Sequence, residues 1–175
     1  MTKRKEAEEQ LRGHIRSFLR GEMRTALLQM GWGVAAFSLG AWCWSTQPDL
    51  LYQGMSLPLM VFAAIHLATG LMQFVQTRKK APMLLAEGVP ERPVLMQELL
   101  RLDILLPRLK FYRKTTLGIV LIGLAMMLAG SLGGFGRYMT GTGSGLILQA
   151  AVTLAIDLFT AMRAGLFQHE LRRFL

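Results

Sequence analysis

Residues 50–77, LLYQGMSLPLMVFAAIHLATGLMQFVQT, contain no Asp, Glu, Lys or Arg. A helix that crosses the hydrocarbon core of a bilayer needs about 20 such residues, so this run is long enough to span it. Three more charge-free runs flank it, at 25–48, 115–136 and 138–156. Because backbone groups in lipid must be hydrogen-bonded internally, each run is predicted to be α-helical. The predicted transmembrane helices lie near 25–46, 54–77, 115–133 and 143–165.

The composition agrees with an all-α integral membrane protein. Of the 175 residues, 52% are hydrophobic and 18% are charged, and the net charge is +9. This balance excludes a disordered chain, and it argues against a free nucleic-acid binder because the charges are separated by long apolar blocks. A single cysteine, Cys43, cannot form an internal disulfide, so a disulfide scaffold is excluded as well.

The basic residues predict the orientation. Seven of the 20 Lys and Arg residues lie in 1–24, nine lie in 78–114, and three lie at or beyond Arg163. Only Arg137 remains for the opposite side. Basic segments stay on the cytoplasmic side of a membrane, so both termini and the 78–114 segment are expected in the cytoplasm. We therefore expect a multi-pass protein of a bacterial inner membrane.

The two halves of the chain match each other when the sequence is shifted by about 90 residues. At an offset of 90, Gly33 meets Gly123 and Gly40 meets Gly130, and at 91 further pairs coincide. Helices of similar apolar composition also share such residues by chance, which is the alternative interpretation. The shared layout favours a repeat, with two tandem, parallel helical hairpins, each preceded by an amphipathic cytoplasmic helix.

This layout divides the chain into four parts. Residues 1–24 are predicted to be an N-terminal amphipathic basic helix, and 25–77 the first transmembrane hairpin. Residues 78–114 hold a cytoplasmic linker at 81–92 and an amphipathic helix that Pro107 should end or kink. The second transmembrane hairpin, with a cytoplasmic helix end, is expected in 115–175.

The two amphipathic helices show a helical period. In the second helix, leucines from Leu95 to Leu109 share one side. We expect the apolar stripe of the first helix to enter the acyl boundary while its arginines contact anionic headgroups. In the alternative, the stripes pack against the protein's own helices. The stripe of the first helix is Leu11, Ile15, Phe18 and Leu19, and its arginines are Arg12, Arg16, Arg20 and Arg24.

Polar residues inside the spans also share helix faces. One face belongs to the second span and the other to the fourth, and in the repeat His66 corresponds to Asp157. A carboxylate within a spanning helix is usually paired, wetted or functional, so these faces form a candidate intramembrane polar site. The candidate residues are His66, Thr69, Gln73, Gln149, Thr153, Asp157 and Thr160.

Two interpretations of this site compete. In the functional one, His66 and Asp157 form a proton or ion relay. In the structural one, which is favoured, they form a hydrogen bond that fastens the second span to the fourth, or Asp157 is wetted near the cytoplasmic interface. Asp157 lies only six residues before Arg163, which supports the structural interpretation.

The sequence predicts no enzyme. His14 and His169 are assigned to the cytosol, His66 to the membrane and Cys43 to its outer edge. These residues cannot come together, so no catalytic, cofactor or metal site is expected. The expected role is that of a structural or accessory subunit of a membrane assembly, acting by helix packing. The alternative is a small channel or a proton- or ion-coupled transporter that uses the polar faces. Expected partners are anionic lipid, further copies of the chain or other membrane subunits, and no nucleic acid.

Overall fold

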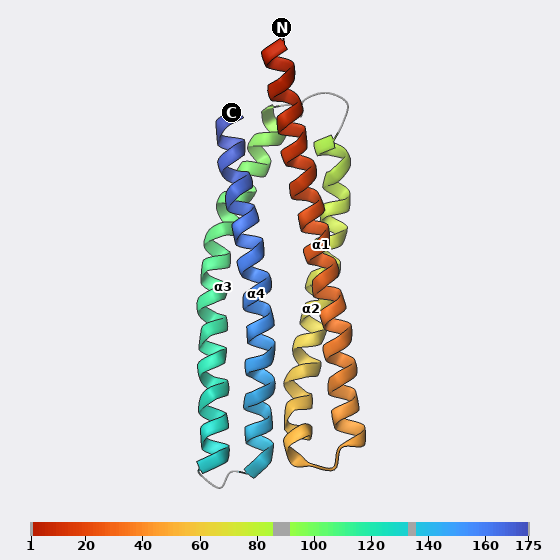
Figure 1. Ribbon diagram of the computed structural model, residues 1–175, viewed down its shortest axis with the longest axis vertical. Coiled ribbons are helices and arrows are strands. Elements are labelled where there is room, and N and C mark those ends of the chain that lie inside the picture. Colours follow the sequence, from red (N-terminus) through yellow and green to blue (C-terminus); the bar gives the residue numbers. More distant parts are fainter. Residues whose placement is uncertain (1, 86–91, 133–135, 175) are drawn as a thin grey trace.

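The computed structural model describes residues 2–85, 92–132 and 136–174, and almost all of them are helical. The helices are α1 (Thr2–Thr46), α2 (Leu50–Leu85), α3 (Arg92–Leu132) and α4 (Gly136–Phe174) (Figure 1). Each is long and apolar enough to cross a membrane. The prediction of an all-α protein with four helices able to span a bilayer is therefore confirmed.

The helices are longer than the predicted spans. The predicted basic helix of 1–24 continues into the first span as α1, and the amphipathic helix after residue 92 continues into the third span as α3. Pro107 was expected to end or kink the helix, and because it lies inside α3 the helix does not end there. Residues 81–85 of the expected linker, including Pro82, belong to α2, while 86–91 lie outside the described residues.

The helices form two antiparallel pairs. α1 packs along α2, α3 packs along α4, and the pairs meet mainly through α2 and α4, with a smaller contact between α1 and α4. The outer turns, at the end away from the termini, are joined by an ion pair of 2.9 Å between Arg137 and Asp49. Asp49 also accepts a hydrogen bond of 3.0 Å from the backbone N–H of Leu51, which caps the start of α2.

At the outer end the helices approach closely through glycine. Gly54 of α2 lies against the backbone of Tyr138, and Gly141 of α4 lies against the backbone of Leu51. A side chain at either glycine would overlap the facing carbonyl. Small residues let membrane helices approach in this way, so the outer half of the bundle is tightly closed between α2 and α4.

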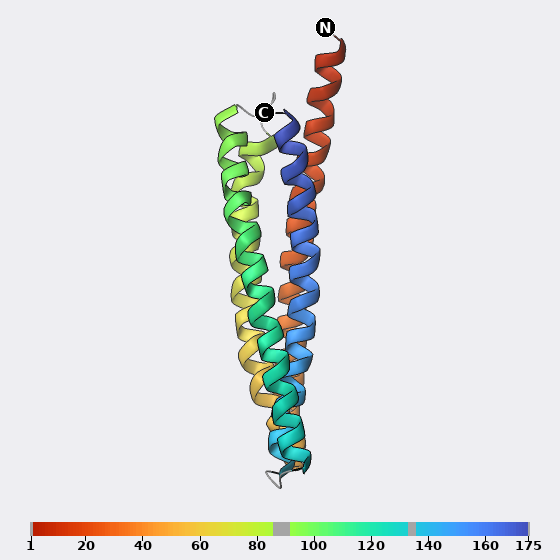
Figure 2. The same ribbon diagram turned by 90° about the vertical axis from the view of Figure 1, so that its left-hand side faces the viewer.

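At the opposite end a hydrophobic core joins all four helices. Phe18 of α1 stacks on Phe167 of α4 with ring centroids 4.1 Å apart. The N-terminal turns of α1 project past the other helices (Figure 2). The core residues are Leu11, Ile15, Phe18, Leu19, Leu84, Leu95, Leu102, Ala164, Phe167 and Leu171.

This core corrects the expectation that the first apolar stripe enters the bilayer surface. All four stripe residues are at most 7% exposed, because they pack into a core with residues of α2, α3 and α4. Burying the stripe against Phe167 and Leu171 removes the same apolar area from water that the acyl boundary would remove. The alternative that the stripe packs on the protein's own helices therefore describes the structure.

Candidate functional site

A cleft of about 770 Å³ lies between α2 and α3, with α4 and α1 at its back. On the other side of the bundle α1 contacts α4, and Arg163 donates a hydrogen bond to Thr25. α2 and α3 have no comparable contact, which leaves the cleft between them. It is lined by Glu22, Gln29, Ile65, His66, Thr69, Gln73, Gln76, Thr77, Lys80, Arg101, Ile104, Leu105, Arg108, Leu109, Tyr112, Thr115, Thr116, Thr153, Asp157 and Thr160.

Most of the predicted polar residues face this cleft. Those that line it are His66, Thr69, Gln73, Thr153, Asp157 and Thr160. Gln149, the remaining candidate, is fully buried on the outer side of the cleft. Its side chain accepts a hydrogen bond of 3.0 Å from Trp32 Nε1 and donates one of 3.4 Å to the carbonyl of Leu59. Gln149 thus fastens α4 to α1 and α2.

His66 is paired with Thr153 at the deep end of the cleft. His66 Nε2 lies 3.2 Å from Thr153 Oγ1, and the Thr153 hydroxyl donates a hydrogen bond of 2.8 Å to the carbonyl of Gln149. With that proton on the Gln149 carbonyl, the hydroxyl oxygen can accept a hydrogen bond from His66 Nε2. Among the described residues no hydrogen bond joins His66 to Asp157, so the predicted link between the second and fourth spans runs through Thr153.

This pairing predicts the effect of removing the threonine hydroxyl. Thr153→Val should lower the free energy of unfolding by about 1 to 3 kcal/mol, because it leaves the buried His66 donor without an acceptor. Thr69→Val is the matched control, since the Thr69 hydroxyl donates to carbonyls of its own helix and no hydrogen bond ties it to another helix among the described residues. Thermal melting in detergent would compare both with the wild type. An equal loss in both variants would contradict the pairing.

Asp157 lies one helical turn beyond Thr153 and is half-buried. The positive charge that acts on it comes from Arg113 of α3, whose Nε is buried without a hydrogen-bond partner. Asp157 of α4 and Arg113 of α3 thus lie near each other on the two helices of the second pair. This arrangement gives the carboxylate a cationic neighbour that the sequence pattern did not indicate.

The threonines of the cleft wall are already satisfied within their own helices. Thr69, Thr115, Thr116 and Thr160 each donate to the carbonyl four residues earlier. Their hydroxyl oxygens are left as acceptors only. Gln29 Oε1 adds a buried acceptor without a partner. The deep wall therefore offers acceptors and methyl groups, and its threonines require no ligand to satisfy them.

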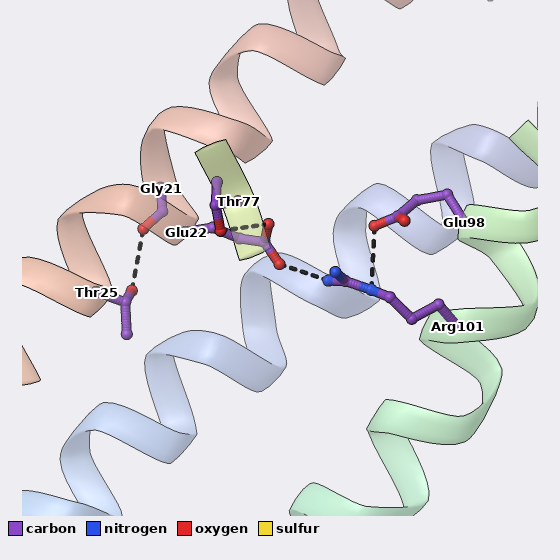
Figure 3. Close-up of polar contacts among 6 residues, drawn as sticks. All are labelled: Gly21, Glu22, Thr25, Thr77, Glu98 and Arg101. Carbon is purple, nitrogen blue, oxygen red and sulfur yellow. Dashed lines mark hydrogen bonds and ion pairs between the residues drawn. The ribbon is translucent and has the colours of Figure 1, made fainter. Parts of the chain in front are cut away.

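A cluster of charged residues lies in the part of the cleft nearest the termini. Arg101 Nη2 lies 2.5 Å from Glu22 Oε1, and Arg101 Nε lies 3.2 Å from Glu98 Oε1 (Figure 3). Thr77 donates a hydrogen bond of 3.3 Å to Glu22 Oε2. The cluster therefore links α1, α2 and α3. Burial, together with the charge of Glu22, raises the pKa of Glu98 to about 7.

This cluster was not predicted from the sequence. Glu22, Glu98 and Arg101 look like ordinary surface charges beside the predicted spans, since each lies in a segment rich in charge. One signal was available, because Glu98 occurs three positions after Leu95 and four before Leu102, on the apolar side of its helix.

The arginines of α1 lie away from the inner core. Arg16, Arg20 and Arg24 are exposed, and Arg12 is half-buried. Their contact with anionic headgroups stays a prediction.

Comparisons with models of protein families, with curated proteins and with solved structures found no match to this chain. Its function must be argued from the geometry of the bundle and the cleft.

Proposed function

We propose that this chain is a non-enzymatic, polytopic inner-membrane protein that acts by helix packing, as a structural or accessory subunit of a membrane assembly. The observation that carries the proposal is the closed outer half. The cleft ends at His66 and Thr153, and beyond it Gly54 and Gly141 bring the backbones of α2 and α4 together. A permanently open path for a solute is difficult to reconcile with such packing. The hydrophobic core near the termini joins all four helices, and in this proposal it would support the partners.

The proposed orientation has both termini in the cytoplasm. Nineteen of the 20 basic residues would lie on that side, at the end of the bundle that holds both termini (Figure 1). The 45 residues of α1 extend over roughly 68 Å at about 1.5 Å per residue, more than twice the hydrocarbon thickness of about 30 Å. The inner bundle would therefore extend well into the cytoplasm.

We further propose that the two helix pairs are tandem repeats. Matching glycines support this. Gly33 of α1 contacts the backbone of Ala63 in α2, and its counterpart Gly123 of α3 contacts the backbone of Gly143 in α4. Gly40 and Gly130 likewise face backbone atoms of the second helix of each pair. The matched positions thus have the same packing role in both halves.

Purification in mild detergent and reconstitution into liposomes would test the proposed role. We expect other membrane subunits to co-purify with the wild type and no ion flux from the purified chain. A homogeneous oligomer of this chain alone that conducts ions would contradict the accessory role.

The convergence of polar residues on one cleft favours a second candidate function, proton- or ion-coupled transport. His66, Thr153 and Asp157 come from both polar faces and line the same space. A carrier would have to separate Gly54 and Gly141 from their backbone neighbours to open outward. If the chain transports ions, Asp157→Asn should abolish flux while leaving the melting temperature close to that of the wild type, because asparagine cannot exchange a proton.

A further inference from the structure

Three polar side chains from three helices lie at one level of the cleft. α2 and α4 both begin at the outer end, and the hydrogen bond between His66 and Thr153 fixes their relative level. Thr69 follows His66, and Asp157 follows Thr153, by about one helical turn each, so these two residues share the next level. Gln29 of α1 packs against the residue that follows Thr69 in α2. All three side chains line the cleft.

The fourth helix reaches the same level at Tyr112. This residue lines the cleft and precedes Arg113, whose charge acts on Asp157. About 20 helical residues counted from the outer ends cross the hydrocarbon core, so its inner boundary lies near Gly70, Tyr112 and Ile156. We call the level of Gln29, Thr69, Tyr112 and Asp157 the boundary level.

Oxygen acceptors without a donor gather at the boundary level. Asp157 forms no hydrogen bond and no ion pair within 4 Å among the described residues. Gln29 Oε1 is buried and has no hydrogen-bond partner there either. The Thr69 hydroxyl donates to its own helix, which leaves its oxygen as an acceptor. A ligand at this level must therefore donate hydrogen bonds, and the carboxylate favours a donor that carries a positive charge.

Two arginines restrict what such a ligand can be. Arg113 is not among the lining residues, so it leaves the Asp157 oxygens free, but its charge reduces their attraction for a cation. Charge alone would therefore not hold a cation here, and N–H groups that reach the acceptors are needed as well. Arg108 lines the cleft about one turn nearer the termini, in the direction of Lys80. The rest of a cationic ligand must therefore point the other way, into the bilayer.

The cleft is apolar and open in that direction. Ile65 and Tyr112 are 50% and 52% exposed, on the α2 and α3 sides of the opening. Ile65, Thr115 and Thr116 lie within the estimated hydrocarbon core, where the threonines present methyl groups because their hydroxyls bond to their own helix. An apolar body attached to the donor would pack between α2 and α3 at this depth.

We propose that the cleft binds an organic ammonium ion with an apolar body, whose N–H groups donate to Asp157 and to Gln29 Oε1. A bare metal ion fits less well, because it needs a close shell of oxygens and the cleft measures about 770 Å³. Binding of this kind requires neither a partner subunit nor an outward opening. The site therefore does not depend on whether the chain is an accessory subunit or a transporter.

Equilibrium dialysis of the full chain in phosphatidylcholine nanodiscs at pH 7 would test the site, with empty nanodiscs subtracted. The probe is 4-phenylbutylamine, which is protonated at this pH. We expect one saturable site per chain. The alcohol 4-phenylbutanol lacks the charge, and the N,N,N-trimethyl derivative of the amine keeps the charge but lacks N–H donors. Both should bind at least about 10-fold more weakly, which is the factor that a hydrogen bond between charged groups contributes.

Variants locate the site in the cleft. Asp157→Asn should weaken binding of the amine by about 10-fold or more, and Gln29→Leu by about fivefold, because each removes one acceptor. Asp103→Asn is the matched control. Asp103 accepts hydrogen bonds from Gln168 and Arg172 and does not line the cleft, so this variant should bind the amine as the wild type does.

Three results would overturn the proposal. One is equal binding of all three compounds to the wild type, which would mean simple partition into the cleft. Another is unchanged affinity of Asp157→Asn for the amine. The third is an equal loss in Asp103→Asn, which would mean attraction by the overall charge. The comparison of the three compounds uses the wild type alone, so it remains decisive even where a variant fails to fold.

Discussion

Gly54→Ala and Gly141→Ala should each destabilise the protein by about 3 kcal/mol, at the upper end of what an added methyl group costs in a packed interior. A side chain at Gly54 would overlap the backbone carbonyl of Tyr138, and one at Gly141 would overlap that of Leu51. A backbone oxygen in a helix cannot rotate away as the end of a side chain can. The two helices must separate instead, and their contacts along the outer half are lost.

The controls come from glycines in open positions. A methyl group at Gly31 or Gly118 would meet no atom within 4 Å. Gly31→Ala and Gly118→Ala should therefore be neutral or slightly stabilising, because alanine is favoured over glycine in helices by roughly 0.5 to 1 kcal/mol. Denaturation in mixed micelles would measure all four variants. Equal effects at the close and the open positions would show that α2 and α4 do not meet at the outer end.

Glu98→Gln should stabilise the protein at pH 8 by about 1 to 3 kcal/mol and have little effect at pH 5. Burial and the neighbouring Glu22 raise the pKa of Glu98 from 4.5 to about 7. The folded state therefore keeps its proton between pH 4.5 and about 7, whereas the unfolded state releases it. The contribution of Glu98 to the free energy of unfolding is complete below about pH 4.5, falls as the pH rises to about 7, and is flat above that.

Melting the wild type and the variant across this pH range would measure the difference. Glutamine stays neutral at every pH, so the curves should diverge between pH 5 and 7. Glu170→Gln is the control, because Glu170 forms only a surface ion pair of 3.5 Å with Arg173. Its removal should cost little at any pH. A Glu98→Gln curve parallel to that of the wild type would mean that Glu98 is already ionised in the folded protein at pH 5.

The sequence was sufficient to predict the four helices because, in a chain of this composition, an uncharged run of about 20 residues is seldom anything but a helix that crosses a membrane. It also placed His66, Thr153 and Asp157 on two faces that meet in one cleft. Helical period alone determines which residues share a face.

The sequence could not predict which groups pair within that cleft. His66 forms its hydrogen bond with Thr153, and not with Asp157, because the partner depends on how far α2 is shifted along its axis relative to α4. A shift of one turn, about 5.4 Å, would change the partner. The continuous helices were missed for a related reason: Pro107 predicts an end or a kink, but α3 continues through it, with the core residue Leu102 buried before it and Leu109 buried after it. The ion pair of Arg101 with Glu22 depends on α3 meeting α1, which no local pattern encodes.

Cysteine accessibility in membrane vesicles tests most directly whether the cleft faces the cytoplasm. Cys43 is the sole cysteine and is buried, so Cys43→Ala provides a background for single replacements at Gln76 in the cleft and at Leu50 in the outer turn. A maleimide that cannot cross membranes should label Gln76→Cys only in inside-out vesicles and Leu50→Cys only in right-side-out vesicles. Labelling of Gln76→Cys from the outside, or protection of it on both sides, would contradict a four-helix membrane bundle with a cleft open to the cytoplasm.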